Sequence, residues 1–403
     1  MKVQLFFLSA TLIYGTFSEF DIYHILQENL VLKVHYRKKS SRKNNYGIEK
    51  LFVIGDSYAD TGNLPKMWKD KPYGLTFPGK PDGRFSDGHI LTDFIADFLG
   101  LKSPVPYRMR NAQKKDLQYG INFAFGGAGV GKTLSSVPNF STQVDFFEEL
   151  IKKAVYSKCD LEHSLTLVTL SGNDYSAFLA RGGTILDLII TFIPGVVQKL
   201  AAILKRISDL GVKRIAVGSL PPLGCVPVIT ISSGFKQCNY TANMASILHN
   251  SILADSVAQL NNESLSTQFE ILDLDAAFTT IIQHVQDRKG ALSYFLDLVV
   301  SSVFQMAFSC CCALPIREVV ITNFFFLGFD APKLHAEAPL TPCCQGIANY
   351  SCGDVDSNGK QMYTVCRKPK HAFFWDNAHP TQAGWHAVFS VLKPTIKDLC
   401  EFS

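Results

Sequence analysis

A serine stands at the end of a short apolar run, where its hydroxyl could act as a nucleophile. The run Leu51–Ile54 is of strand type, and Gly55-Asp56-Ser57 follows it directly, a change from a buried strand to a tight polar turn. A serine hydroxyl is a weak nucleophile at neutral pH, so it needs an adjacent base and donors aimed at the oxyanion. On its own, Gly-Asp-Ser is more typical of a strand that ends in an Asx turn.

A candidate base for this serine lies near the other end of the chain. Asp376 and His379 are three residues apart within Trp375–Thr381, so the carboxylate can bind one ring nitrogen while the other faces a nucleophile. The carboxylate would fix the tautomer and stabilise the imidazolium formed when the ring accepts a proton. A lone Asp-x-x-His is more often a capped surface turn. Paired with the strand-end serine, it predicts a catalytic triad of Ser57, Asp376 and His379.

Two further stretches supply candidate oxyanion donors. Gly126 has no side chain in the way of its backbone amide, and Asn173 carries a side-chain amide. With the amide of Ser57 they would form a three-donor oxyanion hole, in which one donor is worth about 2.7–4 kcal/mol of transition-state stabilisation. Taken singly, the glycine predicts a tight strand–helix turn and the asparagine an Asx turn. Their joint occurrence favours an acyl-transfer site.

Strands and helices alternate along the part of the chain that carries these residues. Strands are predicted at 50–54, 121–125, 165–170, 215–218 and 269–274. The spacing of apolar residues predicts helices at 90–98, 143–156, 196–210, 242–260 and 382–399. This order predicts an α/β fold with a mostly parallel sheet covered on both faces. Ser57, Gly126 and Asn173 then fall at the carboxyl ends of strands, the edge where open α/β sheets bind ligands.

Several blocks of the sequence match the pattern of a known family. They are Phe52–Ser57 with Ala59–Asn63, Asn122–Ala128, Gly172–Tyr175 and Asp376–Thr381, with further similarity at Gly83–Gly88, Pro222–Pro227 and Cys238. On these blocks the chain resembles plant GDSL esterases/lipases of the SGNH-hydrolase superfamily. The resemblance implies a flavodoxin-like three-layer α/β/α sandwich with a mostly parallel central sheet, and no metal or cofactor.

The resemblance also implies a role for each candidate residue. Ser57 is the expected nucleophile, His379 the general base and Asp376 the carboxylate that orients it, while Ser57, Gly126 and Asn173 donate to the oxyanion. The departures from the family pattern are small. Tyr58 stands where the family name expects Leu, and Ser171 occupies the first position of the Gly-x-Asn-Asp block.

The length and composition fit a globular protein with a sizeable core. The chain has 403 residues, 47% hydrophobic and 18% charged, with a net charge of +4; it is too long for a small module stapled by disulfides. So mild a charge requires no nucleic-acid partner, and none is expected.

The N-terminal region is interpreted as a targeting segment followed by a linker. Residues 1–18 begin with Lys2, continue through an apolar stretch and end in small residues, as a secretory signal peptide does. Residues 19–49, with a basic run at 37–43, are interpreted as a linker or a gene-model extension. A single SGNH hydrolase domain is expected at 50–400.

Cysteines and sequons favour a secreted protein, extracellular or in the cell wall. Eleven cysteines are present, and those in polar or Pro/Gly-rich loops are disulfide candidates: Cys225, Cys238, Cys343, Cys344, Cys352 and Cys366. A zinc site at the last four is the alternative, although they lack a Cys-x-x-Cys pair. Glycosylation sequons begin at Asn139, Asn239, Asn262 and Asn349.

One stretch does not match the rest of the expected domain. Residues 291–329 are dense in apolar residues and include Cys310-Cys311-Cys312 and Phe324-Phe325-Phe326. A membrane-spanning helix is one interpretation, weakened by Asp297 near its start and Pro315 near its end. The preferred interpretation is an atypical insertion of gene-model origin, such as a retained intron. No stable membrane anchor is expected, and the protein is expected to be a monomer.

These inferences predict a secreted serine hydrolase that cleaves carboxylic esters of lipids, acylated sugars or wall polymers. His379 must be neutral to accept the proton of Ser57, so activity should fall in acid. An acyltransferase would use the same triad with another acceptor, which product analysis would reveal. A non-catalytic wall or carbohydrate-binding protein on this scaffold is the alternative from another class, and loss of activity in Ser57→Ala would exclude it.

Overall fold

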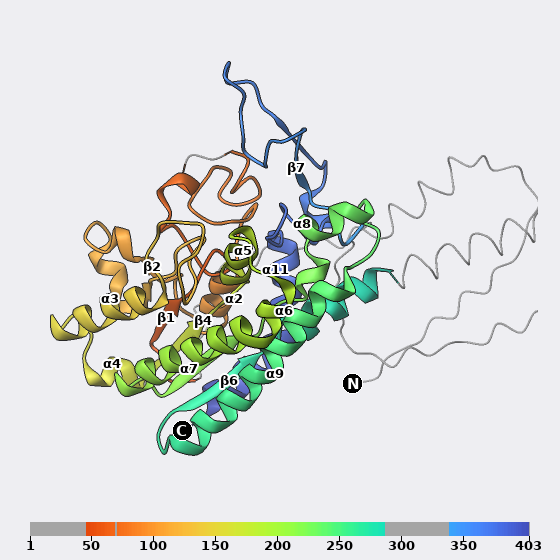
Figure 1. The fold of residues 1–403 in the computed structure, drawn as a ribbon. Coiled ribbons are helices and arrows are strands. Elements are labelled where there is room, and N and C mark those ends of the chain that lie inside the picture. The colour runs from red at the N-terminus through yellow and green to blue at the C-terminus, as the bar shows by residue number, and fades with distance from the viewer. Residues whose placement is uncertain (1–45, 69–70, 287–337, 403) are drawn as a thin grey trace, which may run out of the picture. The chain divides into compact units, whose positions relative to one another are not determined.

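A six-stranded parallel sheet lies at the centre of the computed structural model, which describes residues 46–68, 71–286 and 338–402 (Figure 1). The strand order is β2-β3-β1-β4-β5-β6, and every neighbouring pair is parallel. The strands are β1 Lys50–Ile54, β2 Val105–Pro106, β3 Gly120–Asn122, β4 Ser164–Val168, β5 Arg214–Gly218 and β6 Gln268–Leu272. The first strand, β1, therefore lies inside the sheet between β3 and β4.

Helices cover both faces of this sheet. They are α2 Leu91–Phe98, α3 Phe140–Lys152, α4 Lys158–Glu162, α5 Asn173–Ala180, α6 Ile185–Asp187, α7 Ile193–Asp209, α8 Pro227–Thr230, α9 Tyr240–Glu263 and α11 Gln382–Glu401. Residues 274–286 are also helical, and a π-helical turn, η4 Leu188–Phe192, joins α6 to α7. The 3-10 turns are η1 Pro65–Trp68, η2 Tyr107–Met109, η3 Lys114–Tyr119, η5 Leu223–Cys225, η6 Ile231–Ser233 and η7 Pro369–His371.

The alternation of side chains along β1 explains the two helical layers. Successive residues of a strand point to opposite faces of the sheet. Leu51 and Val53 are buried in a cluster with side chains of α2 and α11, whereas Phe52 and Ile54 are buried in a second cluster with side chains of α3, α7 and α9. The fold is thus a three-layer α/β/α sandwich, as predicted.

Every strand and helix range predicted above overlaps an element of the structure, with shifted ends. The predicted helix at 143–156, for example, starts earlier as α3, because Asn139 accepts a hydrogen bond from the amide of Thr142 at 3.0 Å and so caps the helix at Phe140. The edge strand β2 was not predicted, because two residues are too short to show a periodic pattern.

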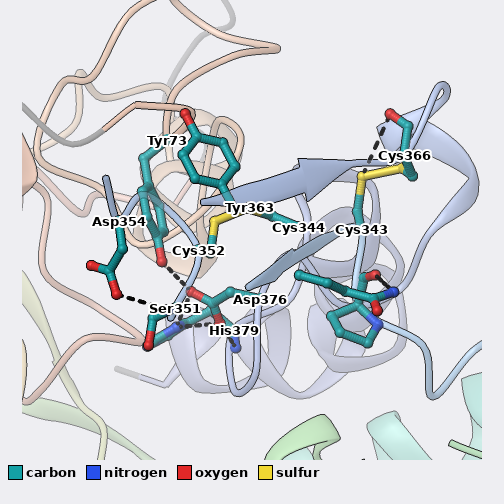
Figure 2. Close-up of a disulfide and its surroundings, with 12 residues drawn as sticks. Tyr73, Cys343, Cys344, Ser351, Cys352, Asp354, Tyr363, Cys366, Asp376 and His379 are labelled. Atoms are coloured by element: carbon teal, nitrogen blue, oxygen red, sulfur yellow. Dashed lines mark hydrogen bonds and ion pairs between the residues drawn. A yellow bond between two sulfur atoms is a disulfide. The ribbon is translucent and has the colours of Figure 1, made fainter. Parts of the chain in front are cut away.

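Three disulfides join the cysteines predicted to form them: Cys225–Cys238, Cys343–Cys366 and Cys344–Cys352. The last two flank a small antiparallel hairpin, β7 Cys344–Gly346 with β8 Tyr363–Val365 (Figure 2). Because all four cysteines of this region are bonded to one another, the zinc alternative is wrong. The described part of the chain also holds two free cysteines, Cys159 and Cys400.

Some predictions fall on residues that the structure does not describe. The signal peptide at 1–18, most of the segment 19–49 and the insertion at 291–329 lie outside the described ranges. In the ranges that are described, one helical stretch, Ile185–Asp209, is long and apolar enough to cross a membrane by length and composition alone. Its larger part is α7, whose apolar face is buried in the core against the sheet.

The four sequon asparagines lie away from the centre of the sheet. Asn239, Asn262 and Asn349 are exposed, and Asn139 is half-buried. Asn139 and Asn239 cap α3 and α9 through their side-chain oxygens, which leaves the amide nitrogen, the atom that carries a glycan, outside the capping bond. Glycosylation of these residues stays a prediction.

Candidate active site

The turn that carries Ser57 is held in place by a glutamine from α3. Gln143 accepts a hydrogen bond from the amide of Gly55 at 2.9 Å and donates one to the carbonyl of Gly55 at 2.9 Å. A side chain at Gly55 would meet the hydroxyl of Thr169 at 2.3 Å, so only glycine fits between β1 and β4. These contacts fix the backbone immediately before Ser57 at the carboxyl end of β1.

The structure brings Ser57, His379 and Asp376 together in one hydrogen-bonded line. Nε2 of His379 lies 2.8 Å from Oγ of Ser57, although the two residues are 322 positions apart. Nδ1 of the same ring lies 2.8 Å and 2.9 Å from the two carboxylate oxygens of Asp376. The juxtaposition predicted from two distant motifs is therefore present.

The turn that carries His379 is held by the residues around it. The backbone carbonyl of His379 accepts a hydrogen bond from the amide of Trp375 at 2.7 Å. The hydroxyl of Tyr58 donates to the carbonyl of Ala378 at 2.9 Å. The ring of Phe85 lies 5.1 Å from the imidazole. The turn and the neighbouring ring thus hold the imidazole beside Ser57.

Asp376 is buried and remains the anionic partner of the imidazole. Burial alone would raise the pKa of its carboxyl, but His379, Tyr73 and the amide of Ala378 outweigh burial, so the pKa lies below its ordinary value. Oδ1 accepts from the amides of Ala378 and His379 at 2.9 Å and 2.8 Å, and Oδ2 accepts from the hydroxyl of Tyr73 at 2.6 Å. The carboxylate is therefore fully hydrogen-bonded.

Asp56, next to the serine, links two of the predicted motifs. Its Oδ2 accepts from the amide and the hydroxyl of Ser171 at 2.5 Å and 2.7 Å, and its Oδ1 accepts from the amide of Tyr58 at 3.2 Å. Burial raises the pKa of Asp56 to about 6, against hydrogen bonds from Ser171 and Tyr58 that lower it. The serine turn and the turn before α5 are thus joined through one carboxylate.

The predicted role of Gly126 as an oxyanion donor is contradicted by its hydrogen bond. The amide of Gly126 donates to Oδ2 of Asp60 at 2.9 Å. Asp60 also accepts hydrogen bonds from the amides of Gly62 and Asn63 at 2.7 Å and 2.6 Å. Its carboxylate therefore joins the loop after β1 to the loop that carries Gly126. The amide of Gly126 is engaged in holding the loop and does not face the pocket as a free donor.

The next residue, Gly127, has the properties predicted for Gly126. Gly127 lines the pocket beside Ser57. Within the described residues, no hydrogen bond engages the backbone amide of Gly127 or that of Ser57. The φ of Gly127 is +81°, and a side chain at this position would meet the hydroxyl of Ser135 at 2.3 Å, so the turn requires glycine here. Nothing in the Gly-Gly pair of the sequence distinguishes which amide is bonded to Asp60 and which is left without a bond in the described part of the chain.

Asn173 follows the strand β4, as predicted, and is the first residue of α5, a helix that the sequence did not predict. Its side-chain nitrogen donates to the carbonyl of Ala128 at 2.9 Å and lies 3.5 Å from Oδ2 of Asp56. The following residue, Asp174, accepts from the amides of Val130 and Gly131 at 3.1 Å and 2.8 Å. These bonds tie the glycine loop to α5 and place both next to the serine.

A pocket of about 640 Å³ opens beside Ser57 and His379. Apolar side chains from α5 to η4 and from the η5 to α9 region form much of its wall: Leu179, Ile185, Leu188, Ile189, Leu223, Val226, Val228, Ile229, Ala242 and Ala245. No Asp, Glu, Lys or Arg of the described ranges lines it. The described residues also contain no group of His, Cys, Asp and Glu side chains suited to hold a metal ion.

Comparisons with known proteins agree with this geometry. The family described as GDSL-like lipase/acylhydrolase matches residues 51–392. GDSL esterase/lipase At5g03610 of Arabidopsis thaliana is 43% identical over 86% of this chain and 86% of its own length. GDSL esterase/lipase At3g09930 of the same plant is 41% identical over 86% of this chain and 88% of its own length.

Among solved structures, one match is LAE5, an alpha/beta hydrolase from the metagenome of Lake Arreo. It has a TM-score of 0.31 and 12% identity, covering 59% of this chain and 81% of that one. The family match spans most of the chain and includes every block on which the site is built. The chain therefore belongs to the GDSL-like lipase/acylhydrolase family, a class of enzymes that cleave carboxylic esters.

Proposed function

We propose that this protein hydrolyses carboxylic esters through an acyl-enzyme on Ser57. The 2.8 Å hydrogen bond between Oγ of Ser57 and Nε2 of His379 is the observation that carries the proposal. Oγ attacks the ester carbonyl while Nε2 takes its proton, and His379 then protonates the departing alcohol. A water that gives its proton to His379 attacks the acyl-enzyme, which releases the acid and restores the serine.

Three donors are proposed to stabilise the oxyanion in both steps. The amides of Ser57 and Gly127 carry no hydrogen bond within the described residues. Asn173 lines the same pocket, and its side-chain nitrogen has two hydrogens, of which one donates to Ala128 and the other makes only a long contact of 3.5 Å with Asp56. Such donors stabilise the charge that develops on the carbonyl oxygen, because they are already fixed in place before the reaction. Gly127 replaces Gly126 in this assignment.

The lining of the pocket favours an ester substrate whose acyl group is uncharged and apolar. Its wall is largely aliphatic, and no ionisable carboxylate, ammonium or guanidinium from the described ranges faces it. Burial of an acyl chain there is favourable by about 0.8 kcal/mol for each CH₂ removed from water. Among lipid, acylated sugar and wall esters, this observation favours those with an apolar acyl chain.

We also propose that the protein is secreted, because it contains disulfides. Three of them lie in the described residues, and disulfides persist in oxidising compartments. The predicted signal peptide and the sequons Asn139, Asn239, Asn262 and Asn349 agree with the same route. Release of the mature chain into the medium of expressing plant cells would test this proposal.

A single series of assays tests both the nucleophile and the acyl preference. Wild type and Ser57→Ala are compared on p-nitrophenyl esters from acetate to palmitate. We expect kcat of Ser57→Ala to fall by a factor of about 10⁴ or more at an unchanged melting temperature, and wild-type kcat/KM to rise from acetate to the medium-length acyl groups. Equal rates in the two proteins would refute the proposed nucleophile, and a maximum at acetate would refute the apolar acyl preference.

A further inference from the structure

Tyr73 is a buried phenol that contacts the proposed triad from outside it. Its hydroxyl donates to Oδ2 of Asp376 at 2.6 Å, across 303 positions of sequence. In Figure 2 this hydroxyl is directed at Asp376, beside the disulfide Cys344–Cys352, whereas the hydroxyl of Tyr363 points away from the carboxylate. Tyr73 is absent from the lining of the pocket, and among the described residues it is joined to the proposed triad by its hydrogen bond to Asp376.

The surroundings of Tyr73 keep this phenol in one position. Its ring lies 6.2 Å from that of Trp375, edge to face, and is buried in a cluster that includes Met67 and Cys344. The next residue, Gly74, has a φ of +72° and donates to the carbonyl of Ser86 at 2.9 Å. The loop that carries Tyr73 is therefore held by its ring packing and by the backbone bond of the next residue.

We propose that Tyr73 is a positioning residue for ester hydrolysis, which holds the carboxylate of Asp376 in the orientation that serves His379. This inference rests on the proposed function. Oδ1 of Asp376 is fixed by two backbone amides, those of Ala378 and His379, whereas the only donors to Oδ2 in the described part of the chain are Tyr73 and the imidazole itself. Without the phenol, the only donor left to Oδ2 among the described residues would be the imidazole of His379, which is the group that Asp376 has to orient.

The hydrogen bond also affects how strongly Asp376 stabilises the imidazolium. Charge-assisted hydrogen bonds are stronger than neutral ones, and the phenol draws part of the negative charge of Asp376 toward Oδ2. When the phenol is removed, more of that charge faces the ring, so His379 holds its proton up to a higher pH. The acid limb of kcat/KM, which reports protonation of the general base, should then move upward.

Few ionisable groups of the described residues surround the imidazole ring of His379. Asp376 lies on the same turn, Asp56 interacts with the imidazole from the turn after β1, and the phenol of Tyr58 interacts with both carboxylates. None of these groups is changed when only Tyr73 is altered. A shift of the acid limb in such a variant can therefore be assigned to the lost hydrogen bond.

The test compares Tyr73→Phe with Tyr363→Phe. Tyr363 belongs to the same cluster and is equally buried, but its hydroxyl points away from Asp376. For Tyr73→Phe we expect kcat to fall about tenfold or more, since a hydrogen bond to a charged group is lost, with KM within about twofold. The acid limb should rise by about half a pH unit or more, while Tyr363→Phe keeps both values.

A variant that restores the donor separates positioning from folding. 4-Aminophenylalanine at position 73 keeps the ring and offers an N–H to Oδ2, so it should recover most of kcat and the wild-type acid limb. In the background of Asp376→Asn, Tyr73→Phe should lower kcat by less than about twofold, because residues that act through one group are not additive.

Several results would overturn the inference. A wild-type kcat and acid limb in Tyr73→Phe would do so, as would a loss of kcat with an unmoved acid limb, which marks a merely structural effect. Failure of 4-aminophenylalanine to recover activity would also count against it. Ser57→Ala distinguishes the two proposals: if that variant is inactive while Tyr73→Phe behaves as wild type, the proposed function stands and only the role of Tyr73 fails.

Discussion

At the scale of single residues, the site depends on which polar atoms are already engaged and which are left for the substrate. Asp56, Asp60 and Asp376 are buried carboxylates whose oxygens are occupied by backbone amides and side chains. The amides of Ser57 and Gly127 are not engaged within the described residues. The carboxylates shape the loops, and the unengaged amides belong to residues that line the pocket.

Removal of the Asn173 side chain tests its proposed role as the third oxyanion donor. In Asn173→Ala, kcat should fall by about 10²–10³ with little change in KM, because one oxyanion donor acts mainly in the transition state. Ser176→Ala, in the same helix, is the matched control; its hydroxyl makes no hydrogen bond within the described residues, and its kcat should stay within about twofold. A rise in KM with an unchanged kcat would show instead that Asn173 only binds the ground state.

At the scale of elements, a loop before α2 braces the turn that carries the triad carboxylate. Ser86 donates to the carbonyl of Pro380 at 2.9 Å, and Asp87 accepts from the amide of Gln382 at 2.7 Å. Arg84 ties this loop to α2 through two bonds to Asp93, at 2.8 Å and 2.7 Å. The start of α11 is thus supported from the other end of the sequence.

Loss of this ion pair should destabilise the protein in a pH-dependent way. Burial alone would raise the pKa of Asp93, but Arg84 outweighs burial and lowers it to about 2. A folded pKa below the unfolded value of 3.8 means that the pair stabilises the fold above about pH 4. That stability is lost as the pH falls through about 2. Arg84→Met leaves buried carboxylates unpaired and should cost about 3–5 kcal/mol near neutral pH.

Urea unfolding at pH 7, 5 and 3 measures this effect. The difference between wild type and Arg84→Met should be largest at pH 7 and should shrink at pH 3. Lys205→Met removes an ion pair with Asp209 in which both side chains are exposed, and its effect should be much smaller. A difference that is constant across the three pH values would show that Arg84 stabilises the loop by packing and not by charge.

At the scale of the whole molecule, the parallel sheet brings distant segments to one edge. Ser57 follows β1, and Asn173 follows β4, the strand that pairs with β1. His379 lies beside Ser57, although it is 322 positions away in the sequence. Five of the six strands, the helices α2, α3, α7, α9 and α11, and these candidate site residues could be predicted, because periodicity and short motifs encode them locally. Their meeting at one edge follows from the parallel topology.

The features that could not be predicted depend on contacts between loops. The sequence Gly126-Gly127 does not tell which amide is already bonded, since Asp60 from another loop accepts from that of Gly126. Tyr73 lies in an irregular segment without a periodic pattern, and its contact with Asp376 spans 303 positions. The walls of the pocket likewise come from elements that only the tertiary structure brings together.

The central claim, that Ser57 is the nucleophile activated by His379, is tested most directly by covalent trapping. The folded protein is incubated with an alkyl fluorophosphonate, and its peptides are analysed by mass spectrometry as activity declines. The account predicts a single phosphonyl group on Ser57, incorporated in proportion to the activity lost and far more slowly in His379→Ala. Complete inactivation with Ser57 unmodified, or an adduct on another residue, would contradict it.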